Sequence, residues 1–249
     1  MIKKRIENKL TELRLSHIKK CYDRLSRTAE AEEMDYRQYL LELLEVESSH
    51  RRENRIQRYL KESKLPLEKS METYDMKRLP GKLSRQIKIL TDGSFIDRRE
   101  NVLAFGNPGS GKTHLVCALA QELIKEGRRC LFTTCSFLIQ KLLASKRELN
   151  LEKELKKISK YEVLIIDEVG YTQQTRDEME VLFTLLAQRY EKASVMITSN
   201  LPFSKWEQIF KDPLTTAAAI DRLVHHSIIL EFNIPSYRVE KAKQKKERR

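Results

Sequence analysis

Long apolar runs, paired cysteines and an apolar leader are all missing from this 249-residue sequence. No run reaches the roughly 18–20 apolar residues that are needed to cross a bilayer. The start, MIKKRIENKLTELRL, is charged throughout and has no apolar signal-peptide region. We therefore expect a cytoplasmic protein that does not enter a membrane. None of the four cysteines belongs to a C-x-x-C pair, so we expect buried, reduced thiols and no zinc site.

Glycine and proline are absent from residues 1–64, which removes the two strongest helix breakers. Apolar residues in this stretch recur three and four positions apart, a spacing that predicts amphipathic helices. Ser16 and Asp35 are plausible N-caps. We expect a small all-α N-terminal domain over 1–68 that supports DNA or partner binding and oligomer contacts. Its helices are expected at about 4–15, 16–28, 35–49 and 50–63, the last two separate or continuous.

Residues 69–99 are predicted to be a basic linker that contains one short amphipathic helix. Pro66 precedes this stretch, Pro80 and Gly81 interrupt helix within it, and the helix is expected at about 82–92. Seven basic and only two acidic residues fall within 76–99. The tail, 236–249, has the same seven and two, so these two stretches carry most of the net charge of +12. Clustered positive charge of this kind suggests a polyanion partner, most simply nucleic acid.

Short apolar runs alternate with helical stretches from residue 101 onward, which indicates a parallel sheet covered by helices on both faces. We therefore predict an α/β core over 100–235 with a five-stranded parallel sheet, followed by the basic tail. The strands are expected at 101–105, 129–134, 161–167, 194–199 and 227–232. The helices are expected at 112–126, 136–148, 151–159, 175–192, 203–210 and 214–225.

A phosphate-binding loop follows the first predicted strand and fits the pattern G-x-x-x-x-G-K-[ST]. The residues are Gly106, Asn107, Pro108, Gly109, Ser110, Gly111, Lys112 and Thr113. Glycines let several backbone N–H groups converge on phosphate oxygens, and the following helix presents its positive end to them. Lys112 is expected to reach the β- and γ-phosphates of ATP, and Thr113 to ligate Mg²⁺.

Polar side chains at the ends of two later strands are expected to complete this site. Asp167 and Glu168 follow the apolar run Val163–Ile166, 55 residues after Lys112. Asp167 is predicted to help hold Mg²⁺, and Glu168 to orient or polarise the water that attacks the γ-phosphate. Asn200, at the end of the next strand, is expected to contact the γ-phosphate or that water.

The order of these motifs resembles that of the AAA+ ATPases, and within them the branch of the DnaC helicase loader and the IstB helper ATPases of insertion sequences. Within this branch, the resemblance to the IstB helper ATPases is stronger than the resemblance to DnaC. The resemblance covers nearly the whole chain and rests on LPLEKSMETYDM, TSNLPFSKWEQIF, AAAIDRLVHHSIILEF and the ending Ser236-Tyr237-Arg238. It implies a P-loop NTPase of the AAA+ type without a C-terminal lid domain, because only about 17 residues follow the fifth strand.

The same resemblance implies roles for individual residues. Asn200 would be the first sensor, and Arg222 an arginine finger that acts in the neighbouring subunit. Tyr74 and Met76 would line the adenine, and we count His114, next to Thr113, among the nucleotide contacts. Arg238 is the one nearby substitute for the second sensor arginine of the missing lid.

The resemblance further implies an ATP-hydrolysing protein that oligomerises on duplex DNA and helps a partner transposase to select its target. A helicase loader and a small-molecule P-loop kinase are the alternatives. No sequence-specific DNA-binding motif is present, so we expect binding with little base preference. The residues expected to contact DNA are Arg51, Arg55, Arg58, Lys77, Arg78, Lys82 and Arg85.

Overall fold

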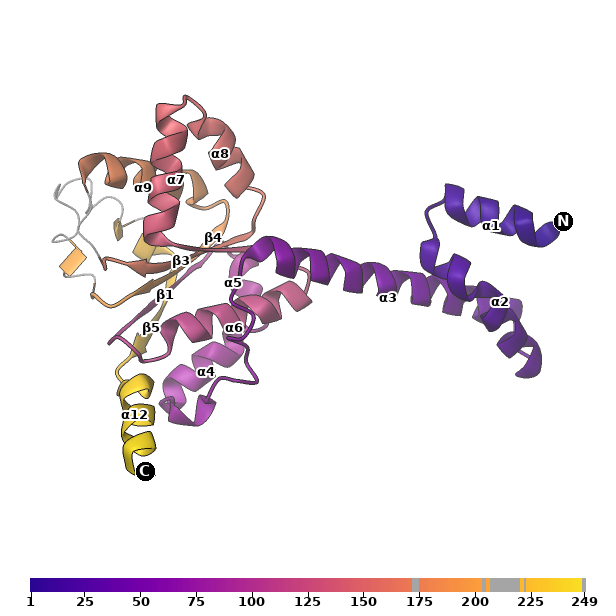
Figure 1. Ribbon diagram of the computed structural model, residues 1–249, viewed down its shortest axis with the longest axis horizontal. Coiled ribbons are helices and arrows are strands. Elements are labelled where there is room, and N and C mark those ends of the chain that lie inside the picture. The colour runs from indigo at the N-terminus through magenta and orange to yellow at the C-terminus, as the bar shows by residue number, and fades with distance from the viewer. Residues whose placement is uncertain (172–174, 203–204, 207–219, 222, 248–249) are drawn as a thin grey trace. The chain divides into compact units, whose positions relative to one another are not determined.

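The computed structural model describes residues 1–171, 175–202, 205–206, 220–221 and 223–247, with side chains up to residue 242 (Figure 1). The chain divides into two compact units, Met1–Arg58 and Tyr59–Arg249. The boundary falls inside one long helix, α3, and each unit is described by itself below. Among the described residues, none of the helices combines the length and apolar character that a membrane span requires.

The N-terminal unit consists of α1 (Ile2–Glu12), α2 (Ser16–Ala31) and the first part of α3 (Tyr36–Ser63). The two helices expected at 35–49 and 50–63 are therefore one continuous helix. Asp35 caps it as expected, because its carboxylate accepts a hydrogen bond from the Arg37 N–H at 3.0 Å. Ser16 is instead the first residue of α2 and makes no side-chain cap. The cap of α2 comes from α3.

That cap is the buried carboxylate of Glu47, which accepts hydrogen bonds from the N–H groups of His17 and Ile18 at 2.9 and 3.1 Å. Arg51 lies one turn further along α3 and donates to the same carboxylate at 2.8 Å. Burial alone would raise the pKa of Glu47, but these hydrogen bonds outweigh it and lower the pKa. The ionised carboxylate thus joins α2 to α3.

The segment expected to be a linker contributes to the packing of the second unit. It contains a short 3₁₀ turn, η1 (Met76–Arg78), and the helices α4 (Gly81–Leu90) and α5 (Ser94–Asp97). Leu83, Ile87 and Leu90 of α4 are buried, as are Phe95 and Ile96 of α5. The expected helix at 82–92 is therefore present as α4. The sequence did not predict α5, nor that apolar residues of α4 and α5 are buried in the core.

The core of the second unit is a five-stranded parallel sheet in the order β2-β3-β4-β1-β5, which confirms the predicted fold class. Figure 1 shows α7, α8 and α9 over one face of the sheet and α4 and α6 over the other. The strands are β1 (Asn101–Gly106), β2 (Cys130–Thr134), β3 (Val163–Val169), β4 (Ser194–Ser199) and β5 (Ser227–Phe232). The helices are α6 (Lys112–Lys125), α7 (Cys135–Arg147), α8 (Leu151–Ile158), α9 (Arg176–Arg189) and α12 (Tyr237–Glu247).

The sheet is buried on both faces, as its nearly unbroken apolar strands predict. Val102, Leu103 and Ala104 of β1 and Leu164 and Ile165 of β3 are inaccessible to solvent. The four cysteines are buried free thiols. The helices expected at 203–210 and 214–225 lie largely outside the described residues.

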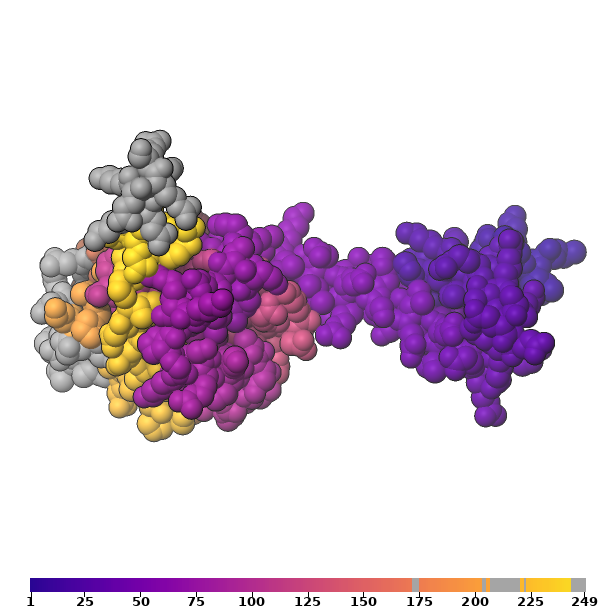
Figure 2. All heavy atoms as spheres, turned by 90° about the horizontal axis from the view of Figure 1, so that it is seen from below, coloured from indigo at the N-terminus to yellow at the C-terminus, as the bar shows by residue number. Residues whose placement is uncertain are grey.

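The part of the chain after β5 that the structure describes forms a single helix, α12, where the sequence suggested only a charged tail. Figure 2 shows this yellow segment lying against the magenta segment that precedes the P-loop. The sheet order places β1 between β4 and β5, so the loops that follow β1, β4 and β5 emerge at one edge of the sheet.

Candidate nucleotide-binding site

The phosphate-binding loop connects the end of β1 to the start of α6, as predicted. Gly111 is the N-cap of α6 and has a φ of +97°, a conformation that L side chains rarely adopt. No side chain of the described residues caps this helix. The first N–H groups of α6 are therefore available to an anion, and the helix dipole favours one there.

The Lys112 ammonium is held at the base of the loop. It donates to the carbonyl oxygens of Gly106 and Asn107 at 2.7 and 2.9 Å, and the residue is 8% exposed. Burial lowers the pKa of Lys112; the Asp167 carboxylate opposes this shift and the Arg238 guanidinium adds to it. A buried ammonium that neutral carbonyls hold is a suitable partner for an incoming phosphate.

Asp167 is a buried carboxylate at the centre of a hydroxyl network. It is 4% exposed, and its Oδ1 accepts a hydrogen bond from Thr113 Oγ1 at 2.8 Å. The Thr198 hydroxyl of β4 donates to the same oxygen. Two hard oxygen donors, Thr113 and Asp167, thus adjoin each other beside the phosphate loop. Mg²⁺ prefers such donors and is usually bound by only one or two protein groups, so these residues fit it.

Glu168, the next residue of β3, lies in a β-bulge and has an unusual backbone conformation. Its φ is +62°, its side chain is exposed, and the pairing of β3 with β4 shifts register between Ile166 and Val169. The Glu168 N–H donates to Thr198 Oγ1 at 3.0 Å. The bulge therefore gives the two acidic residues different surroundings: Asp167 is buried in the hydroxyl network and Glu168 is exposed, and both line the open cavity.

An open cavity of about 520 Å³ lies beside the phosphate loop. It is lined by residues from the loop, from β3, from the segment before α4 and from α12. Five of these are basic side chains: Lys69, Arg78, Lys112, Arg238 and Lys241. Four acidic side chains, Glu68, Asp75, Asp167 and Glu168, nearly balance them, so the features of this cavity that suit a phosphate are the Lys112 ammonium and the N–H groups at the start of α6.

Tyr74 and His114 lie together at one side of this cavity. Their rings meet edge to face with centroids 5.1 Å apart. Burial raises the pKa of Tyr74 to about 12, so the phenol stays neutral. His114 Nε2 lies 3.1 Å from both Thr73 Oγ1 and the Ser70 carbonyl oxygen. His114 therefore fastens the segment before α4 to α6, in addition to lining the cavity.

The structure does not bring every predicted residue to the cavity wall. The lining includes Gly109, Ser110, Gly111, Lys112, Thr113, His114, Tyr74, Asp167 and Glu168. Gly106, Asn107, Pro108 and Met76 are not part of the lining; Asn107 and Pro108 are exposed, and Met76 is half-buried. Asn200 is half-buried one residue past β4 and is not part of the lining. Arg222 lies outside the described residues.

Thr198 is a site residue that the sequence reasoning did not identify. Its position supplied a signal, because Thr198 lies near the carboxyl end of β4, the edge of the sheet at which site residues were expected. Its hydroxyl joins Asp167 and Glu168, and the residue is 1% exposed. Thr198 therefore gives the Asp167 carboxylate a hydrogen-bond donor and the Glu168 N–H an acceptor.

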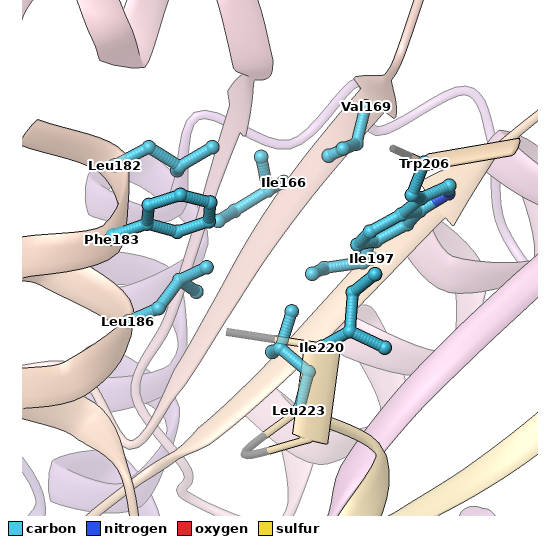
Figure 3. Close-up of a pocket in the computed structure, with 9 residues that line it drawn as sticks. All are labelled: Ile166, Val169, Leu182, Phe183, Leu186, Ile197, Trp206, Ile220 and Leu223. Atoms are coloured by element: carbon cyan, nitrogen blue, oxygen red, sulfur yellow. The ribbon is translucent and has the colours of Figure 1, made fainter. Parts of the chain in front are cut away.

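A second pocket, on the face of the sheet covered by α9, is an apolar packing gap (Figure 3). Its volume is about 10 Å³, and its nine lining side chains, which include Phe183 and Trp206, are all apolar. A space of this size and chemistry does not hold a polar ligand. It belongs to the core of the fold.

The residues expected to bind DNA differ in how far they are engaged within the protein. Arg51 binds Glu47 and donates to the Arg14 carbonyl oxygen, both at 2.8 Å. Arg78 binds Glu240 of α12. Both guanidinium groups are therefore occupied by partners within the protein. The other five, which are Arg55, Arg58, Lys77, Lys82 and Arg85, are exposed.

Comparison with known proteins identifies the family. Residues 8–246 match the family model of the IstB-like ATP binding protein. The chain is 39% identical to an insertion sequence ATP-binding protein of Sinorhizobium fredii, over 96% of this chain and 81% of the relative. It is 36% identical to an insertion sequence ATP-binding protein of Geobacillus stearothermophilus, over 99% and 98% of the two chains.

The fold is similar to that of the DnaC helicase loader, whose crystal structure matches with a TM-score of 0.55 and 20% identity over 72% of this chain and 99% of that one. At this identity the likeness concerns the fold alone, and it agrees with an AAA+ core built around a P-loop. Motifs, cavity and relatives agree: the chain belongs to the IstB-like ATP-binding proteins of insertion sequences.

Proposed function

We propose that this protein uses ATP and Mg²⁺ to assemble on duplex DNA and thereby helps a partner transposase to select and use its target. The observation that carries the proposal is the cavity beside the uncapped start of α6, which is lined by Lys112, Asp167 and Glu168. The positive charge of the chain supports the DNA part of the proposal.

Each group at the cavity has a distinct task in this account. The N–H groups at the start of α6 and the Lys112 ammonium bind the phosphates. Glu168 accepts a proton from, or orients, the water that attacks the γ-phosphate. Thr113 and Asp167 would hold Mg²⁺, which supplies charge neutralisation when it is bound. We propose that Asn200, which lies one residue past β4 and does not line the cavity in this structure, contacts the γ-phosphate or that water.

Neighbouring subunits are proposed to share the nucleotide. Arg222, which the structure does not describe, would reach the γ-phosphate in the next protomer. ATP would then stabilise the oligomer by linkage, because it binds the assembled form more tightly than the separate subunits. Weak contacts to DNA phosphates add up when the subunits repeat along a duplex.

The exposed basic residues of α4 are the best-supported DNA contacts. Lys82 and Arg85 are three residues apart and are therefore neighbours on the helix surface. Neither has a carboxylate within ion-pair distance among the described residues. Lys77 lies just before this helix and is also exposed. We propose this surface in place of Arg51 and Arg78, whose charges are already paired.

Sedimentation of the full chain with ATP and long duplex DNA tests the proposal. We expect ATP-dependent oligomers on DNA, with an affinity that falls steeply as salt is raised. Lys82→Ala/Arg85→Ala should weaken binding at every sequence. Lys153→Ala/Lys160→Ala removes the same charge from exposed positions elsewhere and should have little effect. If the protein stays monomeric whatever the salt and ATP concentrations, assembly on DNA is refuted. If the two double variants lose DNA affinity equally, the α4 surface is refuted.

A further inference from the structure

The C-terminal helix α12 is attached to the wall of the nucleotide cavity by a specific set of contacts. The Tyr237 N–H at its start donates to the Gly109 carbonyl oxygen of the phosphate loop at 3.0 Å. Gly109 has a φ of +78°, and a Cβ there would collide with the Ser236 side chain. The phosphate loop and the start of α12 therefore approach each other as closely as glycine permits.

Arg78 holds the other side of α12. Its guanidinium donates to Glu240 Oε2 at 2.5 Å and to the Pro235 carbonyl oxygen at 3.2 Å. The guanidinium carbon also lies 4.9 Å from the centre of the Tyr237 ring. One side chain thus contacts the turn before α12, its first residue and the residue one turn further along. Arg78 is only one-fifth exposed, so these contacts are partly shielded from water.

The position of α12 determines which charges face the cavity. Arg238 and Lys241 belong to this helix and line the cavity together with Lys112. Arg78 lines it too, from the segment that precedes α4, but Glu240 neutralises its charge. If α12 moved away from the phosphate loop, the cavity would lose two of its cations and one of its walls.

We propose that α12 is a clasp across the nucleotide cavity and that Arg78 is the positioning residue that keeps it closed. The inference rests on the proposed binding of ATP at this cavity. A bound nucleotide leaves more readily when the contacts from Arg78 to α12 open, so these contacts slow nucleotide release. The sequence alone suggested DNA binding for Arg78, and the structure gives this residue a different role.

The rate at which a fluorescent ADP analogue leaves the full-length protein, followed by stopped flow, tests the clasp. Arg78→Gln and Glu240→Gln should each release it about fivefold faster, a modest factor because the ion pair is partly exposed. The double variant should be no faster than Arg78→Gln, because the two side chains act through each other. The control is Arg98→Gln, which removes another Arg–Glu contact of 2.8 Å at the opposite end of β1 and should release at the wild-type rate.

The outcomes separate the two proposals. Wild-type release from Arg78→Gln, or additive effects of the two single variants, would overturn the clasp while nucleotide binding stands. A wild-type protein that binds no nucleotide would overturn both. Thermal unfolding of each variant shows whether the fold is kept, and Glu240→Gln, at the more exposed end of the pair, provides the test if Arg78→Gln does not fold. A merely structural role for Arg78 predicts a lower unfolding temperature with unchanged release, which would also overturn the clasp.

Discussion

Removing the Thr198 hydroxyl should slow ATP hydrolysis far more than it weakens nucleotide binding. Thr198→Val keeps the shape of the side chain but removes the donor to Asp167 and the acceptor for the Glu168 N–H. Losing a hydrogen bond to a carboxylate and leaving the part-buried Glu168 N–H unpaired costs about 2–4 kcal/mol in total. We expect turnover to fall by about ten- to a hundredfold, because Glu168 depends on this bulge for its direction.

Phosphate release under saturating ATP measures this turnover, and calorimetric titration with ADP in the absence of Mg²⁺ measures binding. Binding should change little, since Lys112 and the start of α6 are untouched. Thr198→Ser retains the hydroxyl and should recover most of the turnover. Ser194→Ala is the matched control: this buried hydroxyl of the same strand has no hydrogen-bond partner among the described atoms. Wild-type hydrolysis by Thr198→Val, or an equal loss in Thr198→Ser, would refute the reasoning.

Two further predictions concern carboxylates with different tasks. Glu168→Gln should slow hydrolysis by at least about a hundredfold while ATP still binds, because the residue acts on water and not on the nucleotide; unchanged turnover in a phosphate-release assay would remove Glu168 from the mechanism. Glu47→Gln should speed hydrogen exchange at the start of α2 at pH 7, with a cost of about 1–2 kcal/mol. Since the folded pKa of Glu47 is lowered, its stabilisation is complete above the ordinary value of 4.5 and disappears as the pH falls through the folded value. A difference in exchange that persisted unchanged at low pH would contradict this linkage.

The positions of the P-loop and of the strand-end acidic residues in the candidate site were predictable because these motifs are local in sequence. The phosphate loop follows an apolar strand and opens a helix, and this spacing alone predicts that Lys112 and Thr113 lie at the start of that helix, where the structure has them. Asp167 followed from the rule that polar residues after buried parallel strands meet at one edge of the sheet. The predicted strand ended at residue 167, whereas β3 continues to Val169, because a bulge turns Glu168 outward without ending the pairing with β4.

The roles of the basic residues were not predictable, because a partner carboxylate distant in sequence leaves no local signal. Arg78 and Glu240 are 162 positions apart, yet they form an ion pair. The apolar spacing of α4 predicted a helix but not the surface that buries it, so Leu83 and Ile87 were assigned to a linker. Sequence patterns show which face of a helix or strand is apolar. Only the tertiary arrangement shows which other element covers that face.

The central claim is that a polyphosphate binds where the Lys112 ammonium and the start of α6 converge. Calorimetric titration of the full-length protein with ATP and Mg²⁺, alongside Lys112→Ala, tests it most directly. The account predicts one ATP per chain for the wild type and an affinity at least about tenfold weaker for the variant, because a charge-assisted contact to phosphate is lost. No heat of binding in the wild type, or equal affinity in the two proteins, would contradict it.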